Sequence, residues 1–151
     1  ETLGSLYFNK LFPLGVEAIA EAIALIKAGD PPRIVQDESQ ANYDPLCRDE
    51  HSSIDWSRPA QEVYDHIRGC DPQPGASTMW RGKKIRLYDC SLRKSGGEAT
   101  PGQVVAIGGG SVHIAVNGGA VVAKKIRAES GKVAADELAA QVGLPLGSQL
   151  G

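Results

Sequence analysis

The feature of this chain that most constrains its fold is a change in the spacing of apolar residues at Gly75. Before Gly75, apolar side chains recur three and four residues apart, which is the spacing of one helix face. After Gly75, apolar side chains alternate with others, as at Val112, Ile114 and Val116, which is the spacing of a β-strand. The sequence therefore predicts helices in its first half and a sheet in its second half.

The first predicted helix spans residues 13–29. Its apolar positions lie on one face and are Val16, Ile19, Ala20, Ile23 and Ile26. Pro13 suits a first helical turn, where its missing N–H would have no partner, and Gly29 suits the end. Further apolar residues precede Pro13, and nothing within this segment covers the surface that they form. We therefore expect exposed apolar patches or self-association.

The residues that follow are predicted to be a linker and then a second helix. Residues 30–53 contain prolines and many polar side chains with few clustered apolar ones, as linkers do. The second helix is expected to begin at Ser57, whose hydroxyl can cap it, and to end at Gly69. We interpret Asp55, just before this helix, as a capping or structural residue rather than as a catalytic base.

Beyond Gly75 the sequence predicts about five short strands separated by turns that contain glycine. Gly82 and the triplet Asn117-Gly118-Gly119 favour hairpins. A one-residue shift of the alternation between Leu87 and Cys90 predicts a bulge or a bend. The predicted fold class is mainly β with flanking helices: a small open barrel of the oligonucleotide-binding (OB) type, preceded by a helix and a linker.

The end of the chain is predicted to contain one more helix and a free tail. Residues 134–142 have helical character and are expected to pack over one end of the barrel. From Gly143 onward we expect the chain to fray, because chain ends are poorly ordered unless something holds them.

The net charge of −2 conceals an uneven distribution. Residues 1–80 hold 6 basic and 13 acidic side chains, whereas residues 81–132 hold 10 basic and 3 acidic ones. The predicted binding residues for a nucleic acid or another acceptor are Arg81, Lys83, Lys84, Arg86, Arg93, Lys94, Lys124, Lys125 and Arg127. Such a patch suits a phosphate backbone. The alternative is an ordinary solvated sheet face or charged protection of a strand edge.

Residues for catalysis and for metal binding are not predicted in this chain. The three histidines fall on separate predicted elements, and no nucleophile lies beside a base in the sequence. Three cysteines without close spacing favour free thiols, as in the cytoplasm, over disulfides or a zinc site. We expect no signal peptide, no membrane span and no membrane partner. Because the chain begins at Glu1 and its only methionine is Met79, we expect a piece of a longer protein.

Several stretches resemble the folate-dependent formyltransferase family. Residues 36–41 (QDESQA), 54–60 (IDWSRPA) and 72–76 (PQPGA) resemble the linker and second domain of methionyl-tRNA formyltransferases. Residues 6–15 (LYFNKLFPLG) are more similar to the hydrolase domain of 10-formyltetrahydrofolate dehydrogenases. The tRNA enzymes usually have Trp where this chain has Gln73, so the resemblance leaves the formyl acceptor open: tRNA, water or another amine.

The resemblance implies the acceptor-positioning part of a formyltransferase or formyltetrahydrofolate hydrolase. It assigns residues 1–29 to the last helix of a missing N-terminal Rossmann-like catalytic domain. The remaining ranges are a linker (30–53), an OB-like second domain (54–144) and a tail (145–151). The family's catalytic residues and the 10-formyltetrahydrofolate that it uses belong to the missing domain, so we expect no cofactor on this chain. The competing hypotheses are a stand-alone OB-like nucleic-acid-binding domain without catalysis and a structural domain that orients its neighbours.

Overall fold

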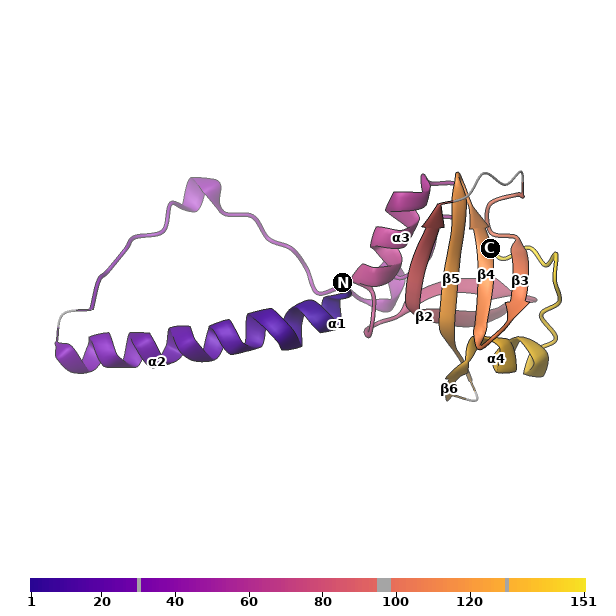
Figure 1. Cartoon of the computed structure of the whole chain (residues 1–151). Coiled ribbons are helices and arrows are strands. Elements are labelled where there is room, and N and C mark those ends of the chain that lie inside the picture. Colours follow the sequence, from indigo (N-terminus) through magenta and orange to yellow (C-terminus); the bar gives the residue numbers. More distant parts are fainter. Residues whose placement is uncertain (30, 95–98, 130) are drawn as a thin grey trace. The chain divides into compact units, whose positions relative to one another are not determined.

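A computed structural model describes residues 1–29, 31–94, 99–129 and 131–151 (Figure 1). The described backbone separates into two compact units, which we treat one at a time. The first unit consists of Glu1 and Leu3–Leu46, and the second of Thr2 and Cys47–Gly151.

A long helical run dominates the first unit. It consists of α1 (Leu3–Leu6), a π-helical turn η1 (Tyr7–Leu11) and α2 (Phe12–Ala28). The predicted helix is confirmed, but the run begins at Leu3 rather than near Pro13. The wider π turn lies just before this proline, where a regular helix would lack one N–H donor. Gly29 ends the run in the left-handed conformation (φ 90°), as predicted.

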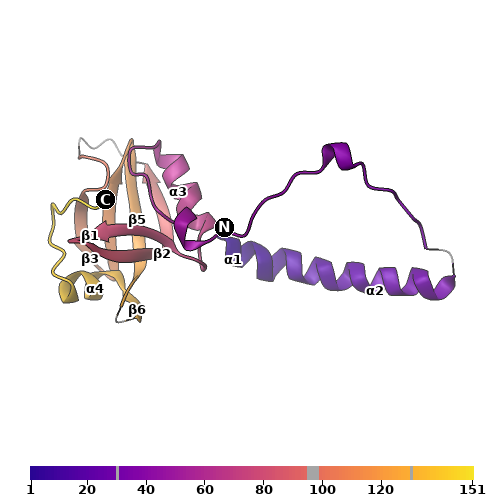
Figure 2. The same ribbon diagram turned by 180° about the vertical axis from the view of Figure 1, so that it is seen from behind.

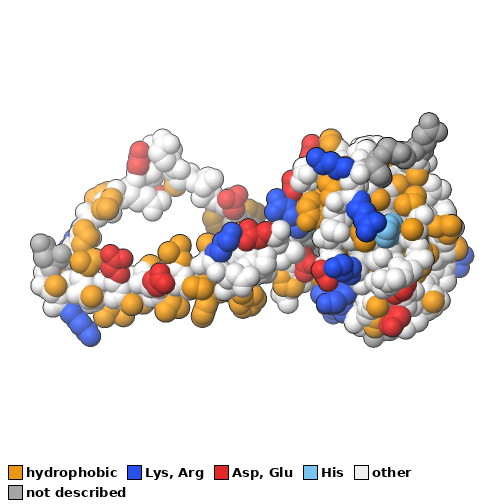
Figure 3. Space-filling view, viewed as in Figure 1, with side chains coloured by type: hydrophobic (Ala, Val, Ile, Leu, Met, Phe, Trp, Pro, Cys, Tyr) orange, Lys and Arg blue, Asp and Glu red, His pale blue; other side chains and the backbone are white. Residues whose placement is uncertain are grey.

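No residue of this helical run is buried. Its most exposed large apolar side chains are Phe8, Phe12, Leu14, Val16, Ile19 and Ile26. The space-filling view shows hydrophobic side chains along the length of this helix (Figure 3). The expectation of exposed apolar patches is therefore confirmed, whereas self-association stays a prediction.

The predicted linker is irregular apart from two short 3-10 turns, η2 (Glu38–Gln40) and η3 (Asp49–His51). Asp30, its first residue, lies outside the described residues. The second compact unit already begins at Cys47, inside this range. The end of the segment is joined to the sheet, because Ser52 and Ile54 exchange backbone hydrogen bonds with Ser77.

The second unit is built on a six-stranded antiparallel sheet (Figures 1 and 2). Its strands are β1 (Ala76–Trp80), β2 (Lys83–Lys94), β3 (Val104–Gly108), β4 (Ser111–Val116), β5 (Gly119–Ala128) and β6 (Gly131–Ala134). The order is β1-β2-β5-β4-β3, with β6 also paired to β5, so the sheet is open. The mainly-β class and the open sheet are confirmed. The OB type stays a prediction, and β6 is a strand beyond the five expected.

A bend in β2 shifts its buried face by one residue, as predicted. Ile85 and Leu87 are buried before the bend, whereas Cys90 and Leu92 pack against the core after it. Asp89 adopts a left-handed conformation (φ 51°) between them. The pairing with β5 keeps one register on both sides of Asp89, so the feature is a bend and not a bulge.

Two helices complete the core of the second unit. The buried residues of α3 (Ala60–Gly69) are Val63 and Ile67, and those of α4 (Ala135–Gln141) are Ala135, Leu138 and Ala139. They join one cluster with the inner side chains of the strands and with Trp56. Burying one such aliphatic side chain contributes about 1.5–3 kcal/mol, so this cluster dominates the stability of the unit.

The predicted fraying after Gly143 is wrong. Leu144 and Leu150 are buried, at 3% and 2% exposure. The tail exchanges backbone hydrogen bonds with Val104 at the β3 edge, and Gly151 N–H donates to the carbonyl of Met79 on β1. The tail thus hydrogen-bonds to β3 and β1, the two end strands of the open sheet, and pairs backbone groups at edges that would otherwise be free.

Candidate functional site

The nine predicted binding residues do not form one surface. Arg86, Lys125 and Arg127 lie on paired segments of β2 and β5, and Lys84 lies on β2 opposite Met79 of β1. Arg81 and Lys83 lie at the β1–β2 turn, and Arg93 and Lys94 at the opposite end of β2. Lys124 and Lys125 are both exposed on β5, between the buried residues Ala123 and Ile126. In the view of Figure 3, the basic side chains of this unit likewise stand in separate groups.

The best-formed group is a row of three cations across three neighbouring strands. Arg86 on β2 pairs with Arg127 on β5, which pairs with Lys132 on β6. Directly opposite residues of antiparallel strands point to one face with Cβ atoms about 4.5–5.5 Å apart. We call Arg86, Arg127 and Lys132 the cationic row. Lys132 was not among the predicted binding residues. It was counted among the basic side chains of residues 81–132, but the strand that carries it, β6, was not expected.

Asp49 binds one end of this group from outside the sheet. Its carboxylate accepts a hydrogen bond from Lys84 Nζ at 2.7 Å and another from the Arg86 guanidinium. The Lys84 and Arg86 hydrogen bonds hold the pKa of Asp49 at about 2, below its ordinary value of 3.8. The Ser52 hydroxyl, itself buried, donates to the Asp49 carbonyl at 2.6 Å and so positions the turn. Sequence spacing could not reveal this contact, because 35 residues separate Asp49 from Lys84.

The cationic row retains unbalanced positive charge. Arg86 Nε is buried without a hydrogen-bond partner, although the side chain also binds Asp49. Lys132 Nζ lies 3.6 Å from the centre of the Tyr88 ring, a cation–π contact that does not neutralise it. Within the described ranges, no carboxylate forms an ion pair with Arg127 or Lys132. Like charges opposite one another destabilise a sheet, so this arrangement suits a function outside folding.

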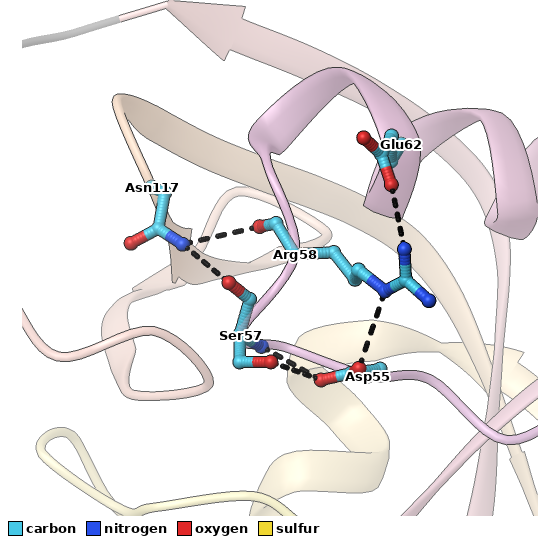
Figure 4. A network of polar contacts seen from close by, with 5 residues as sticks. All are labelled: Asp55, Ser57, Arg58, Glu62 and Asn117. Carbon is cyan, nitrogen blue, oxygen red and sulfur yellow. Dashed lines mark hydrogen bonds and ion pairs between the residues drawn. The ribbon is translucent and has the colours of Figure 1, made fainter.

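A second polar cluster lies where the chain enters α3 (Figure 4). Asp55 accepts hydrogen bonds from the backbone N–H and the hydroxyl of Ser57, and Arg58 bridges Asp55 to Glu62. The Asn117 amide donates to the carbonyls of Ser57 and Arg58 at 2.7 and 3.2 Å. The prediction that this helix begins at Ser57, capped by the serine hydroxyl, is therefore wrong: α3 begins at Ala60 with Pro59 as its N-cap residue, and the Ser57 hydroxyl donates to Asp55. The structural role expected for Asp55 is confirmed.

This cluster borders a shallow hollow of about 290 Å³ that also includes His66. Ionisable groups therefore converge here, which the sequence did not predict. The Ser57 hydroxyl and N–H, followed by Arg58, lower the pKa of Asp55, so its carboxylate is a weak base. Arg58 forms ion pairs with both Asp55 and Glu62, so these charges balance within the cluster. We therefore explain the cluster as a structural support for the start of α3.

Cys70, Cys90 and the half-buried His113 are poorly suited to nucleophilic chemistry. Burial raises the pKa of Cys90 to about 12, with a further contribution from Asp71. Burial, followed by the neighbouring Cys47, raises the pKa of Cys70 to about 11. Burial and then Arg93 lower the pKa of His113. Across the part of the chain that the structure describes, no group of three or more His, Cys, Asp or Glu side chains could hold a metal ion.

Comparison with known proteins gives a family match and several relatives. Residues 47–141 match the family model described as the formyl transferase, C-terminal domain. Methionyl-tRNA formyltransferase of Geotalea uraniireducens is 35% identical over 124 residues, 82% of this chain and 39% of that protein. Cytosolic 10-formyltetrahydrofolate dehydrogenase of Xenopus laevis is 34% identical over 143 residues, 88% of this chain and 16% of that protein. The chain thus spans well under half the length of either relative.

A solved structure shares the fold. HypX from Aquifex aeolicus, in complex with tetrahydrofolic acid, superposes with a TM-score of 0.79 over 96% of this chain and 26% of HypX. The sequences are 23% identical, so this likeness supports the fold alone. Among the described helices, none is long and apolar enough to cross a membrane.

Proposed function

The chain belongs to the formyl transferase C-terminal domain family, and on that premise we propose that it positions the formyl acceptor in a 10-formyltetrahydrofolate-dependent enzyme. In this proposal, another domain with a Rossmann-like fold holds the folate and carries the catalytic residues. The proposal rests on the family match and on curated relatives that are more than twice as long as the aligned region. The folate would supply the formyl group; the residues described above would hold and orient the molecule that receives it.

The observation that carries the acceptor role is the cationic row with its neighbours Lys84 and Lys125. The three cations come from adjacent strands, whose backbones lie about 4.8 Å apart, so they place positive charge on one face of the sheet. A phosphate backbone that neutralises such charges releases counterions, which favours binding at low salt. This supports a polyanionic acceptor such as tRNA, the substrate named for the Geotalea relative.

A second candidate is a hydrolase or dehydrogenase, in which water receives the formyl group. One specific observation favours it: the Xenopus dehydrogenase aligns over 143 residues, against 124 for the Geotalea enzyme. In that case the cationic row would have no polynucleotide to bind. The stand-alone nucleic-acid-binding domain finds no support in the comparisons, because the relatives are formyl-folate enzymes.

The experiment that separates these candidates is tRNA binding measured by fluorescence anisotropy between 50 and 200 mM salt. We expect the wild-type chain to bind with an affinity that falls steeply as salt rises. Replacing Arg127 and Lys132 together by Gln should lower the salt slope by about 2, one unit per lost phosphate contact. The matched control replaces Arg93 and Lys94 by Gln, which removes the same charge at the other end of β2. The tRNA role fails if the wild type does not bind at low salt or if both double variants weaken binding equally.

The same proposal places the enzyme in the cytoplasm. Its support is the set of three free cysteines, of which Cys70 is buried and Cys90 is half-buried. Such a pattern is typical of proteins in a reducing compartment.

A further inference from the structure

A hollow beside the β1–β2 turn contains no residue of the cationic row, although Lys84, a neighbour of that row, also lines the hollow. It has a volume of about 540 Å³, and the residues that line it include Trp80, Arg81, Lys83, Ile85, Glu129 and Gln141. These residues come from the turn, from the end of β5 and from the end of α4. The volume lies within the range of about 300–1,000 Å³ that is usual for small-molecule sites.

The aromatic part of the hollow is held in place. Trp80 is half-buried, and its indole N–H donates to the carbonyl of Val142 at 3.3 Å. This hydrogen bond links the β1 end to the end of α4 and restricts rotation of the ring. Ile85 is buried and adds an apolar wall. The hollow thus offers a fixed flat surface, on which a planar ring can stack at low entropic cost.

The charged part of the hollow is positive. Three of its lining residues are basic and one, Glu129, is acidic. Lys84 is bound to Asp49, whereas no ion pair forms on Arg81 or Lys83 within the described residues. The Arg81 guanidinium lies over the Trp80 ring, 4.9 Å from its centre, so a base that stacks on that face takes the place of the guanidinium. Gln141 and Glu129 add an amide and a carboxylate that could hydrogen-bond to the edge of a base.

We propose that this hollow binds a nucleotide, with its base against Trp80 and its phosphate at Arg81 and Lys83. A planar ring carrying an anionic group matches both halves of the hollow at once. Arg81 and Lys83 supply charge for the phosphate, since they are not neutralised by Asp49. The same chemistry has two sources, a free mononucleotide or one unpaired nucleotide of a strand.

The test uses adenosine 5′-monophosphate and the fluorescence of Trp80. The other tryptophan, Trp56, is buried with its indole bound to Thr78, so a ligand in the hollow changes the Trp80 signal. We expect saturable binding by wild type and at least tenfold weaker binding by Arg81→Asn. Arg81 has φ +47° in a two-residue turn before Gly82, where Asn is favoured, so this variant keeps the fold. Lys94→Gln, which removes a charge at the far end of β2, is the matched control and should bind as wild type does.

Further ligands separate the two sources. Adenosine and ribose 5-phosphate should each bind at least tenfold more weakly than the nucleotide, because each lacks one half of the ligand. A single-stranded oligonucleotide that binds tenfold more tightly than the mononucleotide assigns the site to a strand, and the reverse order assigns it to a free nucleotide. The proposal is overturned if neither binds at millimolar concentration, or if Arg81→Asn and Lys94→Gln weaken binding equally. A chain that fails to bind tRNA but still binds the mononucleotide would reject the tRNA role and keep this site.

Discussion

The helical run and the compact sheet unit use apolar residues in opposite ways. In the sheet unit, side chains such as Ile67, Leu87 and Ile114 have no exposed surface and form one core. In the helical run, Ile19 and Ile26 remain more than 60% exposed although they follow a regular helical spacing. Periodicity therefore predicts that a helix forms but not that its apolar face is covered. The family match begins at residue 47 and so coincides with the unit that has its own core.

The largest loss of stability should come from truncating a buried side chain in the core of the sheet unit. Leu87→Ala should lower the free energy of unfolding by about 2–5 kcal/mol, because a fully buried leucine leaves a cavity. Ile19→Ala on α2 should change it by no more than about 0.5 kcal/mol, because that side chain is 64% exposed. Both tryptophans, Trp56 and Trp80, lie in the sheet unit, so urea unfolding followed by tryptophan fluorescence measures the unfolding of that unit in each variant. Equal losses in the two variants would mean that the helical face is covered in solution.

A similar contrast exists within the tail. Leu150→Ala should destabilise the sheet unit by about 2–3 kcal/mol, since Leu150 is buried in the core cluster. Leu146→Ala should be nearly neutral, because Leu146 is 66% exposed. Thermal unfolding by circular dichroism compares them. If Leu150→Ala melted at the wild-type temperature, the tail would be as free in solution as its sequence suggested.

The smallest expected effect on stability comes from the ion pairs of Asp49 and depends on pH. Because its folded pKa is lowered to about 2, the ion pairs with Lys84 and Arg86 contribute fully above pH 3.8. Their contribution is lost as pH falls through about 2. An NMR titration of the Asp49 carboxyl should show its midpoint near 2 in wild type and closer to 3.8 in Lys84→Gln. A midpoint unchanged by that substitution would show that Lys84 does not hold the carboxylate.

The fold was largely predictable because apolar residues alternate with other residues along the strands, and the turns between strands contain Gly82, Gly109 or Gly118. Even the shift of face around Asp89 could be read from the spacing of Leu87 and Cys90. The tail was not predictable, since Leu144 and Leu150 are too few to define a period. Their burial depends on open strand edges that only the assembled sheet creates.

The candidate site was predictable in composition but not in arrangement. Nine cations were identified by charge, yet strand register alone decides that Arg86 and Arg127 stand opposite each other while Arg93 does not join them. Lys132 was missed because β6 is only four residues long. Asp49 was assigned to the linker, and its contact with Lys84 depends on tertiary structure.

The most direct test of the acceptor role is amide chemical-shift mapping of the chain during titration with tRNA at low salt. We predict that the shifts concentrate on the cationic row, at Arg86, Arg127 and Lys132, and leave Arg93 and Lys94 unchanged. Shifts confined to the Arg93 end of β2 or to α2, or no shifts at all, would contradict the account.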